Sequence, residues 1–197
     1  MLIIQTVVKN PLTLLTLTPN MDGKNSSRKD YISLYHNNYN IPVRIARYHN
    51  IYGPEGTWEG GKEKAPAAIC RKVANACEED SIEVWGDGLQ TRSFLYIDEC
   101  IEATRRIMDS DCTEPLNIGS EEMVTINQLV DIAAKVAGKK ITKVHVDGPL
   151  GVRGRNSNND LVREKLGWDY TMTLEEGIKK TYEWIRWQVS KQIYAEV

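Results

Sequence analysis

The chain has 197 residues, a formal net charge of −2, and 41% hydrophobic and 26% charged residues. This length can bury a sizeable core but is short for a complete two-domain enzyme, and the charge gives no basic footprint for nucleic acid. The first twenty residues are apolar but are interrupted by Lys9, Asn10 and Pro11, so we expect neither a membrane span nor a signal peptide. The composition indicates one soluble globular domain plus a remnant.

The cysteines do not have the spacing of a metal site. The chain has four of them, Cys70, Cys77, Cys100 and Cys112. Cys70 and Cys77 lie seven residues apart on a predicted helix, and reduced core thiols are the simpler interpretation. A cytoplasmic setting therefore fits best.

In chain order, residues 1–40 form a divergent first segment. Its β-branched start permits one or two short strands, and residues 28–38 suit a short helix. Residues 41–197 form the second segment, which begins with a strand-like run, Ile41 to Tyr48. A loop follows with Gly53, Gly56, Gly60 and Gly61, and a helical pattern starts at Pro66.

Lys64 lies just before that helix. A helix N-terminus carries partial positive charge, and partial burial disfavours an ammonium, so both effects lower the pKa of this lysine. Such an amine can serve as an acid or a base. A solvated lysine in a mobile loop is the alternative that the spacing alone leaves open.

Further elements follow the loop. The pattern predicts helices at Pro66–Cys77, from Asp98 as N-cap, after Thr125, at Asn159–Leu166 and after Thr173. In the second helix, Ile101, Thr104, Ile107 and Met108 lie on one side. Strands are predicted at Ile82–Trp85, Arg92–Tyr96, Leu116–Ile118 and Lys143–Val146. This alternation is typical of an α/β fold.

Two arginines, Arg153 and Arg155, flank Gly154 in a loop after a predicted strand. Guanidinium groups bind diphosphate oxygens by paired hydrogen bonds, and Arg92 from another loop can support them. A diphosphate site and ordinary surface charge are both compatible with this pattern.

Several segments resemble the GDP-mannose 3,5-epimerases, which belong to the extended short-chain dehydrogenase/reductase group. The most specific match runs from His49 to Ala68 and contains Gly56-Thr57-Trp58 and Glu63-Lys64-Ala65-Pro66. Other matches are Trp85 to Phe94, Asn117 to Ser120 and Gly151 to Ser157, within a likeness from about Ile41 to about Trp187.

The resemblance implies a Rossmann domain and a smaller domain that closes over the sugar nucleotide, of which this chain keeps mostly the second. In the family, NAD oxidises the sugar at C4, acid and base groups invert C3 and C5, and the hydride returns. GDP-mannose becomes GDP-L-galactose, and a place in L-ascorbate biosynthesis is implied. By resemblance Lys64 is one acid/base group, and the positions that contact the GDP-sugar are Asn50, Glu63, Ala65, Lys72, Gln90, Thr91, Arg92 and Arg155. Arg153 is added on the charge argument alone, and a surface charge is the other interpretation of Lys72.

The resemblance fails toward the beginning of the chain. The family's Tyr-x-x-x-Lys pair would fall on Met21 and Asn25, and no glycine occurs before Gly23, so the glycine-rich dinucleotide fingerprint is missing. The family's cysteine acid/base group also lies upstream of the matched region. We therefore expect the Rossmann domain to be largely missing and NAD, the family cofactor, not to be held by this chain.

Three hypotheses follow. The chain is an epimerase of this family, with little or no turnover by itself; or a non-catalytic fragment that binds a nucleotide sugar or pairs with a full-length subunit; or another sugar-nucleotide epimerase or dehydratase. The expected partner is a GDP-sugar, with no nucleic acid and no membrane, and a homodimer is left open.

Overall fold

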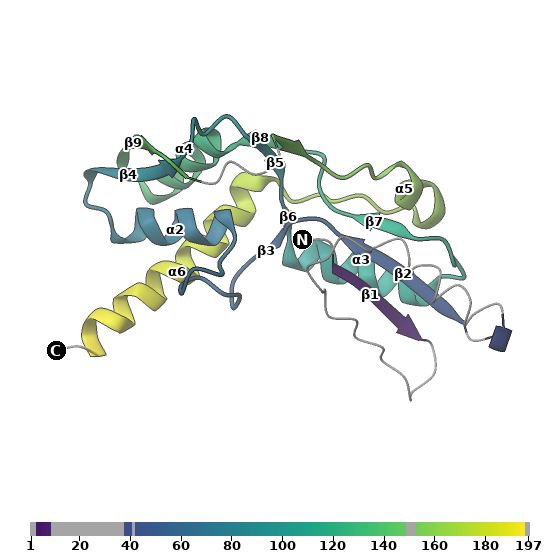
Figure 1. Cartoon of the computed structure of the whole chain (residues 1–197). Coiled ribbons are helices and arrows are strands. Elements are labelled where there is room, and N and C mark those ends of the chain that lie inside the picture. Colours follow the sequence, from purple (N-terminus) through teal and green to yellow (C-terminus); the bar gives the residue numbers. More distant parts are fainter. Residues whose placement is uncertain (1–2, 9–37, 41, 149–152, 196–197) are drawn as a thin grey trace.

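The computed structural model describes residues 3–8, 38–40, 42–148 and 153–195 (Figure 1). Strands and helices alternate along the chain, which confirms the α/β class. The strands are β1 (Ile3–Val8), β2 (Val43–Tyr48), β3 (Ile51–Tyr52), β4 (Glu79–Trp85), β5 (Thr91–Ser93), β6 (Leu95–Tyr96), β7 (Leu116–Ile118), β8 (Met123–Thr125), β9 (Lys140–Val146) and β10 (Gly154–Arg155). The helices are α2 (Ala65–Asn75), α3 (Ile97–Asp109), α4 (Ile126–Ala137), α5 (Asp160–Leu166) and α6 (Leu174–Ala195).

One sheet is built around β2. β7 pairs with β2 in parallel, and β1 pairs with its other edge in antiparallel register, with Ile3 opposite Tyr48. The expected strand in the first twenty residues is thus confirmed, whereas the predicted helix at 28–38 lies almost entirely outside the described residues. α3 packs against β2 and α5 against β7, and these elements share a core of buried residues that includes Leu116, Ile118 and Val162.

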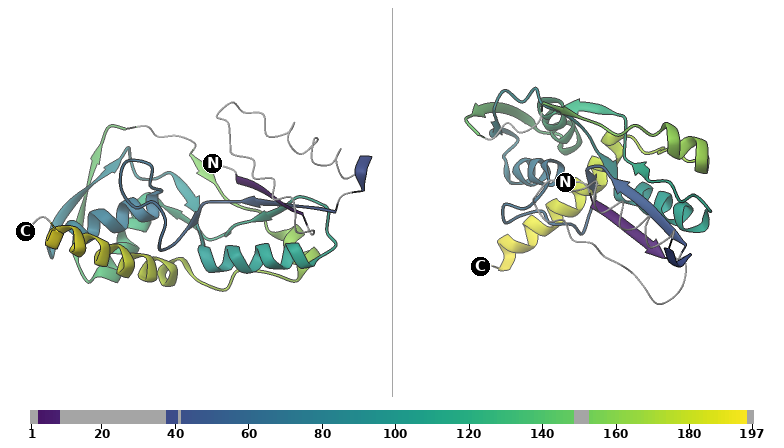
Figure 2. Two further views of the ribbon diagram at one scale, coloured as in Figure 1. Left: turned by 90° about the horizontal axis from the view of Figure 1, so that it is seen from below. Right: turned by 45° about the vertical axis from the view of Figure 1, so that its right-hand side comes forward.

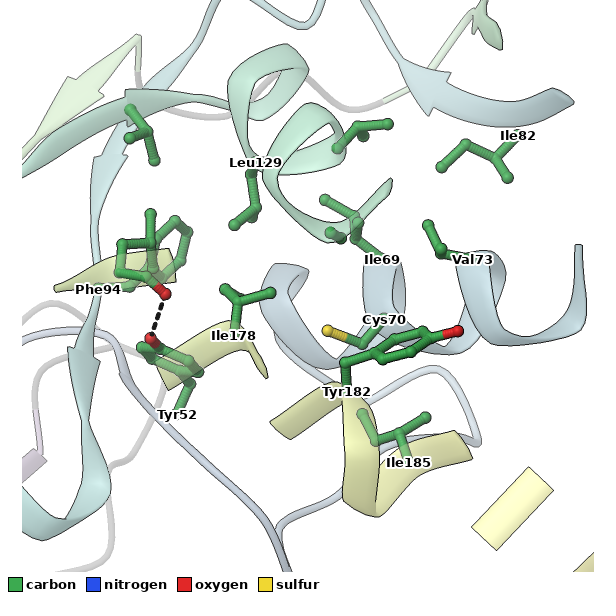
Figure 3. Packing of buried hydrophobic residues seen from close by; sticks show 14 of the residues in the cluster. Tyr52, Ile69, Cys70, Val73, Ile82, Phe94, Leu129, Ile178, Tyr182 and Ile185 are labelled. Carbon is green, nitrogen blue, oxygen red and sulfur yellow. Dashed lines mark hydrogen bonds between the residues drawn. The ribbon is translucent and has the colours of Figure 1, made fainter. Parts of the chain in front are cut away.

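A second core lies among α2, α4 and α6, which pack on one another beside the parallel pair β4 and β9 (Figures 1 and 2). Leu174, Ile178, Ile185 and Val189 of α6 are all buried there, as their helical spacing predicts. Figure 3 shows Ile178 between Leu129 of α4 and Cys70 of α2. The C-terminal helix therefore holds this half of the molecule together.

Short strands connect the two cores. β3 pairs in parallel with β6, and β5 lies between β8 and β10. The predicted strand Arg92–Tyr96 is consequently two strands, since Phe94 interrupts the ladder and the halves join different sheets. This crossing places the ends of β2, β3, β5 and β10 near one another.

The helix boundaries follow their capping residues in most places. Thr125 and Gln128 form the expected capping box, with reciprocal hydrogen bonds of 3.0 and 2.8 Å. Gly138 ends α4 in a left-handed conformation, with φ of 68°. Asp98, in contrast, is not an N-cap: Tyr96 holds that position, and Asp98 lies in the first turn, where its charge suits the helix dipole.

The buried side of α3 carries Cys100, Ala103 and Ile107, of which only Ile107 belongs to the row of four residues seen in the sequence. Ile101, in the same row, is 59% exposed. Ile101 and Met108 instead line an open hollow of about 580 Å³ with mostly apolar walls. Cys70 is buried as expected, but Cys77 lies beyond the end of α2 and is exposed.

Two kinds of feature are absent from the described residues. None of the helices in these ranges has the length and apolarity needed to cross a membrane. The same ranges contain no cluster of His, Cys, Asp and Glu suited to a metal ion.

Candidate functional site

The turn between β2 and β3 places Asn50 beside β5. Asn50 has a left-handed φ of 45°, a conformation that asparagine tolerates better than most residues. Its side-chain amide donates to the Ser93 carbonyl at 2.9 Å, and its own carbonyl accepts from the Leu95 amide at 3.3 Å. Asn50 therefore positions the backbone between β5 and β6.

Lys64 occupies the N-cap position of α2, directly before Ala65. Its Nζ donates a hydrogen bond of 3.0 Å to the Ile51 carbonyl. Although much of the lysine side chain is exposed, burial around the amine lowers its pKa, and the nearby Cys100 thiol opposes that shift weakly. The direction agrees with the sequence prediction.

The neighbours of Lys64 are held by local contacts. Glu63 accepts a hydrogen bond of 2.7 Å from Arg71 through Oε1, and its Oε2 is buried without a hydrogen-bond partner. Backbone amides and Arg71 lower the pKa of this carboxyl. Ala65 is half-buried and packs against the core around α6. An unpartnered buried oxygen at Glu63 is an available acceptor for a ligand hydroxyl.

Lys72 lies elsewhere. Its Nζ donates 2.7 Å to the Glu83 carbonyl, at a second hollow of about 310 Å³ lined by residues of α2 and β4, among them Arg71, Asn75 and Asp80. Neither of the two hollows described for this structure is lined by Lys64, Arg92 or Arg155. Lys72 lines one of these two hollows, and the two arginines line neither.

Gln90 and Thr91 lead into β5. The Gln90 amide donates to the Trp85 carbonyl at 3.3 Å, and its Oε1 is buried without a partner. The Thr91 amide donates to the Arg153 carbonyl at 2.9 Å, which joins this segment to the arginine loop. A free acceptor at Gln90 thus lies next to two of the predicted arginines.

Arg92 and Arg155 are register partners on adjacent parallel strands, β5 and β10. Burial and the charge of Arg155 lower the pKa of Arg92. Among the described residues, the guanidinium of Arg92 donates one hydrogen bond, to the carbonyl of Thr91 at 2.7 Å. Within those residues neither guanidinium has a carboxylate partner. Two neighbouring unpaired guanidinium groups create a field that favours an anion.

Arg153 differs from that pair. Its Nη1 lies 3.2 Å from Oδ2 of Asp87, in the Gly86-Asp87-Gly88 turn, and both side chains are largely exposed. The ion pair fastens the arginine loop to the turn. Arg153 consequently has a structural partner that Arg92 and Arg155 lack.

Sequence reasoning missed three polar residues here. Ser93 is fully buried and its Oγ has no partner, and Arg47 on β2 has a buried, unpartnered Nε. His49, between β2 and β3, lies close enough to Arg155 and Arg47 for both charges to act on its imidazole. Arg47 could have been found from the sequence, since a cation inside a strand rich in buried residues is unusual.

The described residues do not fit a dinucleotide. β6 and β8 pass directly into α3 and α4 without a glycine loop. The glycine-rich connection, from β3 to α2, lacks the Gly-x-Gly-x-x-Gly spacing that brings a helix N-terminus onto a pyrophosphate. We therefore derive no step through such a cofactor.

A family model described as GDP-mannose 4,6 dehydratase matches residues 26–181. The chain belongs to this family. Among curated relatives, GDP-mannose 3,5-epimerase from Arabidopsis thaliana is 53% identical over 158 residues, and GDP-mannose 3,5-epimerase 1 from Oryza sativa subsp. indica is 52% identical. The resemblance seen in the sequence is thereby confirmed. These matches cover 80% of this chain but 41% of each relative, so the chain spans about two fifths of their length.

Solved structures support the same fold. UDP-glucose 4-epimerase from Thermotoga maritima superposes with a TM-score of 0.76 at 28% identity, covering 83% of this chain and 52% of the other. UDP-glucuronic acid 4-epimerase from Bacillus cereus, in complex with UDP-glucuronic acid and NAD, gives 0.69 at 27% identity, covering 86% and 51%. The fold is that of part of an extended, NAD-dependent sugar-nucleotide epimerase.

Proposed function

We propose that this family member is the nucleotide-sugar-binding part of a GDP-mannose 3,5-epimerase. The observation that carries the proposal is that Arg92 and Arg155 are in register on β5 and β10, and that neither has a carboxylate partner in the part of the chain that the structure describes. The identity of 53% to a GDP-mannose enzyme supports the sugar nucleotide, because UDP-sugar enzymes are less similar: UDP-N-acetyl-alpha-D-glucosaminuronate decarboxylase from Bacillus cytotoxicus is 32% identical, and UDP-glucuronate 4-epimerase from Thermodesulfobacterium geofontis is 28% identical.

In this proposal Arg92 and Arg155 bind the diphosphate. Guanidinium forks make paired, charge-assisted hydrogen bonds to phosphate oxygens, and no carboxylate of the described residues competes for them. The free acceptor of Gln90 and the backbone at Thr91 lie beside the arginines. Lys72 contributes only if it leaves the Glu83 carbonyl, and Arg153 only if it leaves Asp87.

Lys64 is the proposed acid/base group. A lowered pKa increases the neutral fraction of the amine at physiological pH, so that Nζ can accept a proton from an acidified sugar carbon, or in its charged form donate one, on its own face of the ring. Inversion needs a second acid/base group on the opposite face. The hydrogen bond to the Ile51 carbonyl fixes the position of the amine. Asn50 on one side, and Glu63 and Ala65 on the other, shape the surroundings of this group.

NAD belongs to the family, as its presence in the Bacillus cereus structure illustrates. The 197-residue polypeptide carries neither the Tyr-x-x-x-Lys pair nor the glycine fingerprint, so the proposal is that by itself it binds the sugar nucleotide without turnover. A cytoplasmic location and a place in L-ascorbate biosynthesis remain part of the proposal.

Calorimetric titration of the chain with GDP-mannose and with UDP-glucose tests the binding proposal. Tighter binding of GDP-mannose supports it, and equal or reversed affinities favour another sugar-nucleotide enzyme. Incubation with GDP-mannose and NAD tests the second claim. Clear formation of GDP-L-galactose would refute the absence of turnover.

A further inference from the structure

Two arginines of β2 have contrasting surroundings. Arg44 is buried and its guanidinium is fully engaged, with bonds to the Ser110 carbonyl at 2.7 Å, to the Val43 carbonyl at 2.9 Å and to Asp111 at 3.3 Å. Arg47 is half-buried, its Nε is shielded from solvent without an acceptor, and no ion pair reaches it from the described residues. Since three positions separate them, the two side chains leave opposite faces of the strand.

The guanidinium groups of Arg47 and Arg155 both lie near the imidazole of His49. Burial is the largest effect on the pKa of His49 and lowers it, whereas a hydrogen bond with Asn117 raises it. The charges of Arg155 and Arg47 lower the pKa of His49 further. Both guanidinium groups are therefore neighbours of one imidazole. Because Arg155 also acts on Arg92, the basic groups form a continuous cluster across β2, β5 and β10.

The packing around His49 fixes this arrangement. A Cβ at Gly119 would lie 2.8 Å from the Cβ of His49 and 2.6 Å from that of Ser157, so only glycine lets these segments approach. The Ser157 hydroxyl donates to Asn159 at 2.7 Å, and the Asn159 amide donates to the Gly119 carbonyl at 2.8 Å, both inside the protein. These contacts hold the chain just after Arg155 against the turn that carries His49.

Arg47 and Arg92 are half-buried and Arg155 is exposed, and no carboxylate of the described residues pairs with them. Such a cluster of cations is costly, because like charges repel and desolvation penalises the charged forms of the half-buried members. The same arrangement becomes favourable when an anion enters it. The Nε of Arg47 is a hydrogen-bond donor that is shielded from solvent and has no acceptor. A phosphate oxygen placed against it would supply the missing hydrogen bond.

We propose that Arg47 is a third anion-binding arginine, which together with Arg155 and His49 forms a phosphate subsite adjoining Arg92. The subsite takes a diphosphate group, which a sugar nucleotide supplies in the proposed function; because the described residues lack a glycine-loop seat for a dinucleotide, NAD is the contrasting ligand of the test. It extends the proposed function, and the sugar-nucleotide case rests on that function. Arg47 acts on the phosphate directly, through its guanidinium donors.

The test compares Arg47→Gln with Arg44→Gln, a matched arginine of the same strand on the opposite face. Binding of inorganic pyrophosphate, GDP-mannose and NAD is measured by calorimetry, with urea unfolding as a check on the fold. We expect Arg47→Gln to weaken pyrophosphate binding at least tenfold with little change in unfolding, and Arg47→Lys to restore part of it. Arg44→Gln should lower stability and leave the dissociation constant of the folded protein unchanged.

If Arg47→Gln weakens the binding of GDP-mannose or of NAD as it weakens that of pyrophosphate, that ligand is the source of the diphosphate. Unchanged pyrophosphate affinity in Arg47→Gln, an equal loss in Arg44→Gln, or no pyrophosphate binding by the wild-type chain would each overturn the inference. Wild-type binding of pyrophosphate without GDP-mannose would instead refute the proposed function and leave the subsite standing.

Discussion

Lys64 Nζ lies 3.0 Å from the Ile51 carbonyl, so a main-chain atom of β3 positions the amine that precedes α2. A backbone acceptor stays in place whatever side chain Ile51 carries. The position of the amine therefore depends on the β3–β6 pairing, in which Ile51 lies opposite Leu95. That pairing connects the loop rich in glycine to the strands that carry the arginines.

The amine of Lys64 should titrate below an ordinary lysine. Burial lowers the pKa of Lys64. The rate at which a trace reagent acylates Lys64 should therefore reach half of its maximum at a lower pH than the rate for the side-chain amine of an Nα-acetyl-lysine amide standard in the same tube. Peptide mass spectrometry across pH 7 to 11 measures this. A profile that coincides with the standard would show that the amine is fully solvated and unsuited to proton transfer at neutral pH.

The two arginines of the loop should differ in their effect on binding. Arg155→Gln should weaken GDP-mannose binding by roughly 10- to 100-fold, since a hydrogen bond to a charged group contributes about 1.5–3 kcal/mol. Arg153→Gln should change it by less than about threefold, because Arg153 is paired with Asp87. Equal losses in the two variants, measured by calorimetry, would mean that Arg153 leaves Asp87 for the ligand.

Gly177 on α6 should not tolerate a side chain. A Cβ there would lie 2.2 Å from Oη of Tyr52, whose hydroxyl donates to the Leu174 carbonyl at 3.3 Å. Overpacking of about 1–3 kcal/mol should outweigh the gain in helix propensity of about 1 kcal/mol, so urea unfolding of Gly177→Ala should show lower stability.

The matched control for that change is Gly56→Ala, where the nearest atom to the new Cβ is 3.7 Å away and stability should move by less than about 0.5 kcal/mol. Tyr52→Phe should relieve part of the Gly177→Ala defect. A double-mutant cycle without coupling would show that the hydroxyl is not the obstruction.

His49 should make the fold sensitive to mild acid. Burial leads the effects that lower its pKa, so the folded protein binds a proton less readily than the unfolded chain, whose value is about 6.5. This stabilising contribution is present above pH about 6.5 and is lost as the pH falls through the folded value. Urea unfolding at pH 7.5 and 5.5 should therefore show a larger drop for the wild type than for His49→Gln. An equal drop would assign the acid sensitivity to carboxylates.

Local signals predicted the elements well and their packing less well. Thr125 with Gln128, and Gly138, mark the ends of α4 because capping depends on residues within one turn. The buried face of α3 carries the small side chains Cys100 and Ala103, which hydrophobicity alone does not rank first. The split between β5 and β6 depends on distant partners, β8 and β3, that no local pattern names.

In the functional site, too, local sequence signals differ from contacts between segments far apart in the sequence. Arg92 and Arg155 were predicted to act together, and they are register partners on adjacent strands. The ion pair of Arg153 with Asp87 and the hydrogen bond of Lys72 to Glu83 join segments far apart in the sequence, so spacing could not reveal them. The roles of these residues toward a ligand remain proposals.

A crystal structure of the chain with GDP-mannose tests the central claim most directly. The account predicts the diphosphate between Arg92 and Arg155, with the mannose ring within hydrogen-bonding reach of the Lys64 amine. A sugar nucleotide bound elsewhere, or one whose mannose lies away from Lys64, would contradict it.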